Sequence, residues 1–187
     1  FTSNSDGLAN YGTEIGRLYL RLRNNAEFRL LWADRVQRHF YNGGAMTGAN
    51  IANRFRELQT ELSAIIPNMD QSILTWVRNR NSTFFSQMTS QGLLSSVTAP
   101  TFSQFGGRVP AGFTLTMTAP AGTICFTTNG TDPRVPFTGA VSASATAYSA
   151  AVLVDSTLAI NARARQGTNW SALTSATFTY AALGSPL

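Results

Sequence analysis

The single histidine, His39, limits the acid–base and nucleophilic chemistry that this chain can support. A Ser-His-Asp triad would have to use it as the base. It lies between Arg38 and Phe40 at the end of a predicted helix, where an imidazole can bond to terminal carbonyls and interact favourably with the helix dipole. One histidine and the lone Cys125 also supply too few soft ligands for zinc. We therefore predict no catalytic, cofactor-binding or metal-binding residue.

The carboxylates that could serve acid–base chemistry have simpler interpretations. Glu57 and Glu61 lie four residues apart on one helix face, which an acid–base pair could use, but like charges at this spacing usually mark a solvated face. Three further acids have arginine neighbours within helical reach, which favours local ion pairs: Glu27, Asp34 and Asp70. None of them is assigned to catalysis.

Asp132 lies in the segment Asn129-Gly130-Thr131-Asp132-Pro133, where its carboxylate and the Asn129 amide could join a calcium loop. One acid is too few for a hard-cation site, whereas an Asx turn needs only this side chain. The segment therefore predicts a turn.

Exposed aromatic rings are the remaining means of binding a ligand, because pyranose rings stack on flat apolar faces. Trp170, beside a predicted hairpin turn, and Tyr148 are the candidate ligand-binding residues.

The composition indicates a globular chain with few charges. The 187 residues are 43% hydrophobic and 12% charged, and they are enough for one large or two small cores. All fourteen basic residues are arginines, and the formal charge of +5 reflects scarce acids. Most of the arginines precede residue 100 and alternate with acids at helical spacing. Solvated ion pairs are therefore favoured over nucleic-acid binding, and no nucleic-acid partner is predicted.

Single features of the sequence bear on membrane insertion, disulfide formation and processing. No apolar run approaches eighteen residues, so no membrane span is predicted. The only cysteine, Cys125, allows no intrachain disulfide and is expected to be a small buried hydrophobe. The chain starts with Phe1 and a polar stretch unlike a signal peptide, so we expect a processed chain or a fragment.

Residues 13–91 carry apolar side chains at helical spacing. Asn25 is expected to cap a helix over residues 26–40, which a turn at Gly43-Gly44 ends. Thr47 or Asn50 should cap the next helix, which Pro67 stops. A fourth helix is expected over about residues 70–90, with Asn79-Arg80-Asn81 able to interrupt it and Gly92 closing it.

After residue 100, short Thr- and Val-rich runs alternate with Gly, Pro and Asn-Gly at intervals of roughly ten residues, as in a small antiparallel β-sandwich. Six or seven strands are expected, including residues 113–118, 123–128, 147–152, 157–165 and 174–180. We therefore predict an α+β chain. Its parts are a helical domain of three to four helices (1–94), a linker (95–99) that packs between the halves, and an immunoglobulin-like antiparallel β-sandwich (100–187).

Several motifs after residue 99 occur together: Pro100-x-Phe102-Ser103, Gly106-Gly107, the run from Thr123 to Pro133, Ala162-Arg163-Ala164 and Trp170-Ser171. Through them residues 100–180 resemble the chitobiase/β-hexosaminidase C-terminal type of immunoglobulin-like domain. Family members usually have Tyr-Tyr-Thr and Asp-Gly where this chain has Cys125-Phe126 and Asn129-Gly130. The resemblance implies an immunoglobulin-like fold and places Trp170 as a packing residue.

A second resemblance covers residues 15–94, and its motifs are Leu22-x-x-Asn25-x-Glu27-Phe28-Arg29, the run from Asp34 to Phe40 and the run from Asn42 to Thr47. These resemble the C-terminal helical part of CotH-type proteins, kinase-like proteins first known from spore coats. In that family the nucleotide- and metal-binding residues lie upstream of such a segment, so none of its catalytic residues falls on a position here. The two resemblances in this order imply a large secreted bacterial protein, extracellular or at the cell surface.

The function expected from these observations is a non-catalytic structural or interaction module. Its expected partners are other domains of the same polypeptide, protein partners, copies of itself through sheet edges or helix faces, or a polysaccharide. Two alternatives stay open. One is a carbohydrate-binding accessory module, and the other is the C-terminal fragment of a CotH-type kinase-like enzyme that lacks its phosphotransfer site.

Overall fold

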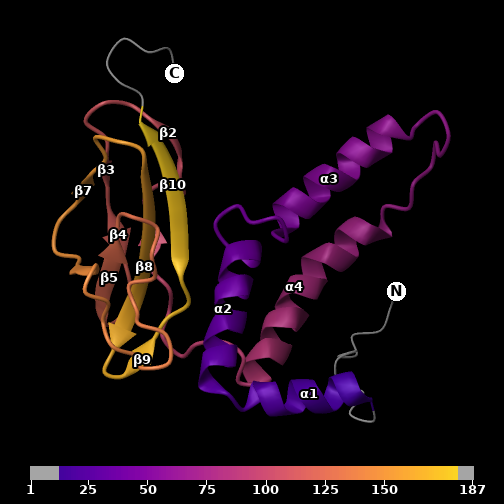
Figure 1. The fold of residues 1–187 in the computed structure, drawn as a ribbon. Helices are drawn as coiled ribbons and strands as arrows, with labels where there is room; N and C mark the ends of the chain where they lie inside the picture. The colour runs from indigo at the N-terminus through magenta and orange to yellow at the C-terminus, as the bar shows by residue number, and fades with distance from the viewer. Residues whose placement is uncertain (1–12, 181–187) are drawn as a thin grey trace.

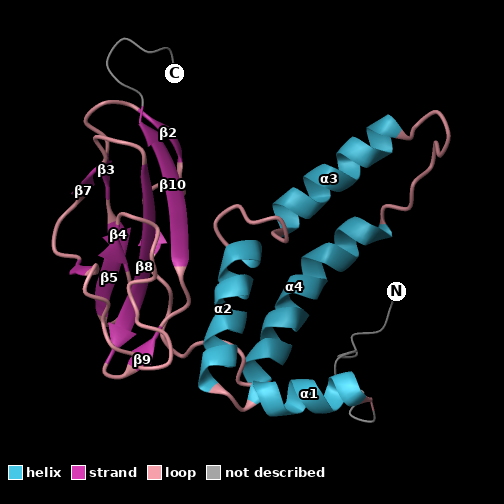
Figure 2. Cartoon of the chain, viewed as in Figure 1, coloured by secondary structure: helices cyan, strands magenta, loops and turns pink. Residues whose placement is uncertain are grey.

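The structure, a computed structural model, describes residues 13–180 as helices followed by mostly antiparallel sheets (Figures 1 and 2). The α+β prediction is confirmed. The helices are α1 (Glu14–Arg23), α2 (Ala26–Phe40), α3 (Gly48–Glu61) and α4 (Ser72–Ser90). The strands are β1 (Thr101–Phe102), β2 (Gly107–Val109), β3 (Thr114–Leu115), β4 (Met117–Thr118), β5 (Thr123–Thr127), β6 (Thr146–Ala147), β7 (Val152–Leu153), β8 (Leu158–Gln166), β9 (Asn169–Trp170) and β10 (Thr174–Tyr180).

Side-chain caps start the first three helices. Thr13, Asn25 and Thr47 each accept a hydrogen bond from a backbone N–H of the first turn. The predicted caps at Asn25 and Thr47 are confirmed, and α2 has the predicted bounds. The helix α4 runs through Asn79-Arg80-Asn81 without interruption, and Gly92 follows it with φ +67°.

Among the helices, α2 is the one that lies against the sandwich (Figure 1). The antiparallel pair α3 and α4 extends away from the sheets, and α1 crosses near the base of α2. Tyr19, Met88 and Leu93 form the small buried core of this part, with Phe28 and Trp32 packed around it. Because α2 packs against both this core and the sheet, it positions the side chains that lie between the helices and the sandwich.

The main sheet has the order β2-β10-β8-β5-β6, with β9 also paired to β8. The pairs β1-β4 and β3-β7 form the smaller sheets. Alternation along β10 sends Thr174, Ala176 and Phe178 inward and leaves the intervening residues exposed. The sandwich core is contributed by strands throughout this part: Phe102, Val109, Leu115, Met117, Ile124, Val154, Ile160, Ala162, Ala176 and Phe178.

Residues 13–180 form ten strands instead of the predicted six or seven, since two predicted strands are divided and β1, β2 and β9 lie outside the predicted ranges. The run 113–118 becomes β3, which pairs with β7, and β4, which pairs with β1. Between them Thr116 leaves both ladders, since its N–H donates to Ser103 Oγ and its carbonyl accepts from the Ser103 N–H. The run 147–152 likewise gives the end of β6 and the start of β7. Period-two patterning cannot show such a change of partner.

No helix in the described range is long and apolar enough to span a membrane.

Candidate functional site

The hairpin formed by β8 with β9 and β10 contains a bulge next to α2. Arg165 pairs with Trp170 and Ala162 with Thr174, so residues 163–164 on one side oppose residues 171–173 on the other. Ser171 holds the bulge, because its N–H donates to the Ala164 carbonyl and its hydroxyl accepts from the Ala164 N–H. The Leu173 N–H donates out of the hairpin to Asp34 Oδ1 of α2, at 2.8 Å.

Arg163 lies on β8 opposite the bulge and faces away from the sandwich core. Its side chain is 2% exposed, although arginine is rarely so deeply buried. Nη1 and Nη2 donate to the two carboxylate oxygens of Asp34, each at 2.7 Å. Nε and Nη2 donate to Asp132 at 2.8 and 2.7 Å, and Nη1 also donates to the Ser171 carbonyl at 2.8 Å. All five guanidinium N–H groups are therefore bonded.

The charges around Arg163 are held by mutual pairing. Burial opposes its positive charge, but the hydrogen bonds that it donates to Asp132 and Asp34 outweigh this effect and raise the pKa of Arg163 above its ordinary value. Burying a guanidinium costs free energy of folding unless its partners are well placed. Removing one partner destabilises the fold more than replacing the whole ion pair by apolar residues does. The cluster Asp34–Arg163–Asp132 thus ties the position of α2 to that of the sheet.

A second ion pair joins α2 to the loop that contains Asp132. Glu27, in the first turn of α2, accepts from both terminal nitrogens of Arg134, with Nη1 at 2.9 Å from Oε2. The hydrogen bond from Arg134 and a further one from the Phe137 backbone lower the pKa of Glu27, against the effect of burial. Glu27 and Asp34 are seven residues apart, which places both on one face of α2.

The backbones approach closely between these ion pairs. Ala33 of α2, Ala99 of the connecting segment and Ala172 of the bulge form a buried cluster of small side chains. Ser95 Oγ donates to the Trp170 carbonyl at 2.7 Å. We call the two ion pairs and this alanine cluster the helix–sheet clamp.

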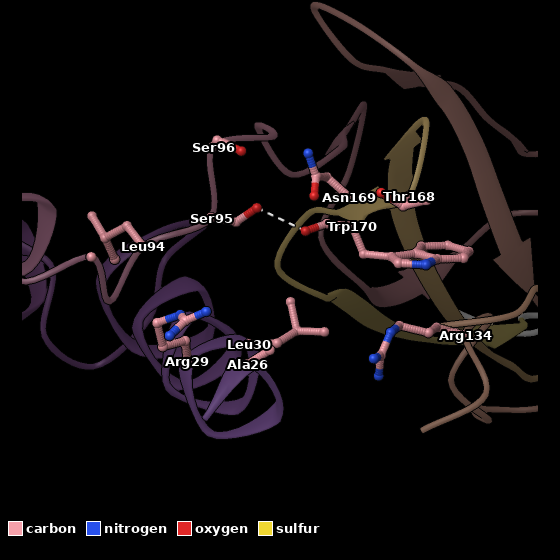
Figure 3. A pocket seen from close by; sticks show the side chains of 11 residues that line it. Ala26, Arg29, Leu30, Leu94, Ser95, Ser96, Arg134, Thr168, Asn169 and Trp170 are labelled. Carbon is pink, nitrogen blue, oxygen red and sulfur yellow. Dashed lines mark hydrogen bonds between the residues drawn. The ribbon is translucent and has the colours of Figure 1, made fainter. Parts of the chain in front are cut away.

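A cavity of about 310 Å³ lies beside the clamp (Figure 3). Its walls combine polar and apolar groups from both parts of the chain: Ala26, Arg29, Leu30, Gly92, Leu94, Ser95, Ser96, Arg134, Thr168, Asn169 and Trp170. Hydroxyl, amide and guanidinium groups could hold a small polar ligand there.

The two predicted ligand-binding residues lie in different places. Trp170 lines this cavity but is 6% exposed, its indole N–H donates to the Gly139 carbonyl, and the Arg165 guanidinium lies over its ring. Tyr148 packs against the sandwich core, and its hydroxyl accepts from the Met117 N–H. The structure does not bring Trp170 and Tyr148 together, and the contacts of each side chain are those of a packing residue. Ligand binding by either stays a prediction.

The predicted partners of several acids need correction. Asp34 and Glu27 pair with Arg163 and Arg134 across the chain and not with neighbours on their own helix, because α2 turns this face toward the sheet. Asp70 accepts from Ser72 at the start of α4 and not from an arginine.

Other expectations for charged residues are confirmed. Glu57 and Glu61 are exposed and share Arg54, as expected for a solvated face. Asp132 forms the predicted Asx turn through the Arg134 N–H, in addition to its bonds with Arg163.

His39 and Cys125, the other residues considered for chemistry, lie where a side chain can serve packing or a helix end. His39 lies in the last turn of α2, half-buried. Cys125 is buried opposite Arg163 on the neighbouring strand, and burial raises the pKa of its thiol. Within residues 13–180 no group of three His, Cys, Asp or Glu side chains is placed to hold a metal ion.

Comparison with known families gives one match. Residues 113–178 match the family described as Fn3 associated, which indicates an immunoglobulin- or fibronectin-like associated domain in this part of the chain. The match includes Asp132, Arg134 and Arg163 but neither of their partners on α2. Searches of curated proteins and of solved structures give no significant match.

Removal of Asp34 should destabilise the whole chain, because it leaves a buried guanidinium with half of its carboxylate partners. We expect Asp34→Ala to lower the free energy of unfolding by about 2 to 4 kcal/mol. Asp155→Ala is the matched control, since Asp155 is exposed and such changes cost within about 0.5 kcal/mol. Urea unfolding of both variants measures the difference, and equal midpoints would contradict the clamp.

The Glu27 pair should make stability depend on pH in the acid range. The pKa of Glu27 is lowered in the folded chain from its ordinary value of 4.5, so its contribution is complete above that value and is lost as the pH falls through the folded value. We expect Glu27→Gln to be less stable than wild type at neutral pH. The difference in unfolding free energy between the two should narrow below pH 4.5, the ordinary pKa of the carboxyl. Urea midpoints measured across this range test it, with Glu14→Gln as the exposed control. A gap that is constant with pH would refute this role of Glu27.

Proposed function

We propose that the chain is a non-catalytic structural and interaction module of a bacterial extracellular or cell-surface multidomain protein. In this proposal it sets a fixed orientation between the parts of the protein that its two ends join. The observation that carries the proposal is the helix–sheet clamp, because a spacer with freely moving halves would not need a fully bonded, buried arginine between them.

The Fn3-associated match supports an accessory role, since it covers β3 to β9, most of β10 and the clamp residues Asp132, Arg134 and Arg163. The proposed bacterial and extracellular setting rests on the resemblance of the helical residues to CotH-type proteins and of the sandwich to chitobiase-type domains. Under this proposal the chain descends from the tail of a kinase-like protein and carries no phosphotransfer site. Its partners are then other domains of the same polypeptide or copies of itself.

A carbohydrate-binding accessory module is the second candidate function. The cavity beside Trp170 favours it, because that cavity offers hydroxyl and amide groups as well as part of an aromatic side chain. The buried position of Trp170 limits stacking of a sugar on its ring. A ligand here would have to be held by side chains such as Asn169 and Ser96.

Distance measurements between the two parts test the structural role. Spin labels at Ser86 on α4 and Thr118 on β4, both exposed, in a Cys125→Ala background should give one narrow distance distribution by pulsed electron resonance. Adding Glu27→Ala and Asp34→Ala should broaden it, because the ion pairs to Arg134 and Arg163 are lost.

A broad distribution in the chain without the clamp substitutions would contradict the proposal. So would nucleotide binding by the chain in a calorimetric titration, since it would restore an enzymatic role.

A further inference from the structure

A larger groove, of about 630 Å³, lies between the C-terminal half of α2 and β10. The helix contributes Leu31, Asp34, Arg35 and Arg38, followed by Tyr41. The other wall is formed by residues 173–177 and by Phe105, which lies between β1 and β2. We call it the α2–β10 groove.

The α2–β10 groove is positively charged. Asp34 is the acid in its lining, and both of its carboxylate oxygens are bonded to Arg163. Arg35 and Arg38 are exposed, and neither has an ion-pair partner among residues 13–180. Beyond the groove, Arg108 is paired in register with Thr179 and is exposed on the same face of the sheet. The groove therefore favours an anionic ligand.

Two aromatic rings are partly exposed at this groove. Tyr41 is 43% and Phe105 38% exposed, unlike Trp170. Phe105 is stacked on Phe102 with ring centroids 5.9 Å apart, and Tyr41 packs at 5.3 Å against Phe85. Both rings are thus held in place while part of their surface stays open to a ligand.

The groove also offers hydroxyl groups and aromatic rings from its side chains. Along residues 174–178 β10 is paired with β8, whereas its pairing with β2 begins only at Phe178, beyond the groove residues. The side chains available for recognition are guanidinium groups, the exposed Ser175 and Thr177 hydroxyls, and the two rings. Guanidinium groups bind carboxylates in bidentate fashion, hydroxyls bond to hydroxyls, and aromatic rings accept the C–H face of a pyranose.

We propose that the α2–β10 groove binds an acidic polysaccharide, one whose pyranose units carry carboxylates. This site is separate from the cavity beside Trp170, and it does not depend on the spacer role. Its walls come from both parts of the chain, so the clamp keeps it open in the absence of ligand.

Calorimetric titration with oligogalacturonate tests the proposal. Wild type should bind it, and Arg35→Gln with Arg38→Gln should weaken binding about tenfold or more, because each charge-assisted contact is stronger than a neutral one. Tyr41→Ala should weaken binding through loss of stacking. Arg17→Gln with Arg21→Gln, which removes the same charge from α1, should leave the affinity unchanged.

Several outcomes would overturn the proposal. Absence of oligogalacturonate binding would do so, as would equal loss in the α1 control, which would mean attraction to net charge alone. Binding of poly-glutamate as tightly, with the same dependence on Arg35 and Arg38, would assign the groove to an acidic peptide. Binding of neutral glucan unaffected by these arginines would assign carbohydrate to another site. A narrow spin-label distribution in the Arg35 and Arg38 double variant keeps failure here distinct from failure of the spacer role.

Discussion

The architecture of this protein depends on how one buried guanidinium is paired. Arg163 extends from the outer face of β8, where a strand residue normally meets solvent or a neutral neighbour, and receives carboxylates from α2 and from the Asp132 turn. The cost of removing three charges from water is offset only when both acids are in place. The helix, the turn and the bulge at residues 171–173 are therefore required together, which makes the interface specific as well as stable.

The sequence predicted most of what depends on local signals. The cap at Asn25, the bounds of α2 and the Asx turn at Asp132 follow from side chains that bond to backbone a few residues away. The strands at β8 and β10 follow from long apolar alternation. Division of residues 113–118 between two sheets could not be predicted, because it depends on Ser103 capturing the backbone of Thr116.

The clamp was missed for a related reason. Asp34 and Glu27 have arginines at helical spacing in the sequence, and local pairing is the simplest interpretation of such a pattern. The partners that the structure assigns are more than one hundred residues away, Glu27 and Arg134 being 107 apart and Asp34 and Arg163 129 apart. The available signal was Arg163 itself, a charge between two alanines in a long strand, because a charge at such a position needs a partner from another element.

Native-state hydrogen exchange compared between α2 and β8 tests most directly whether the clamp makes one unit of the two parts. If Arg163 couples them, the slowest amides of α2 should exchange with the same free energy of opening as those of β8, and Asp34→Ala should lower the α2 value toward a separate, local opening. If α2 already exchanges in the wild type at a much lower free energy than β8, the two parts open independently and the account is wrong.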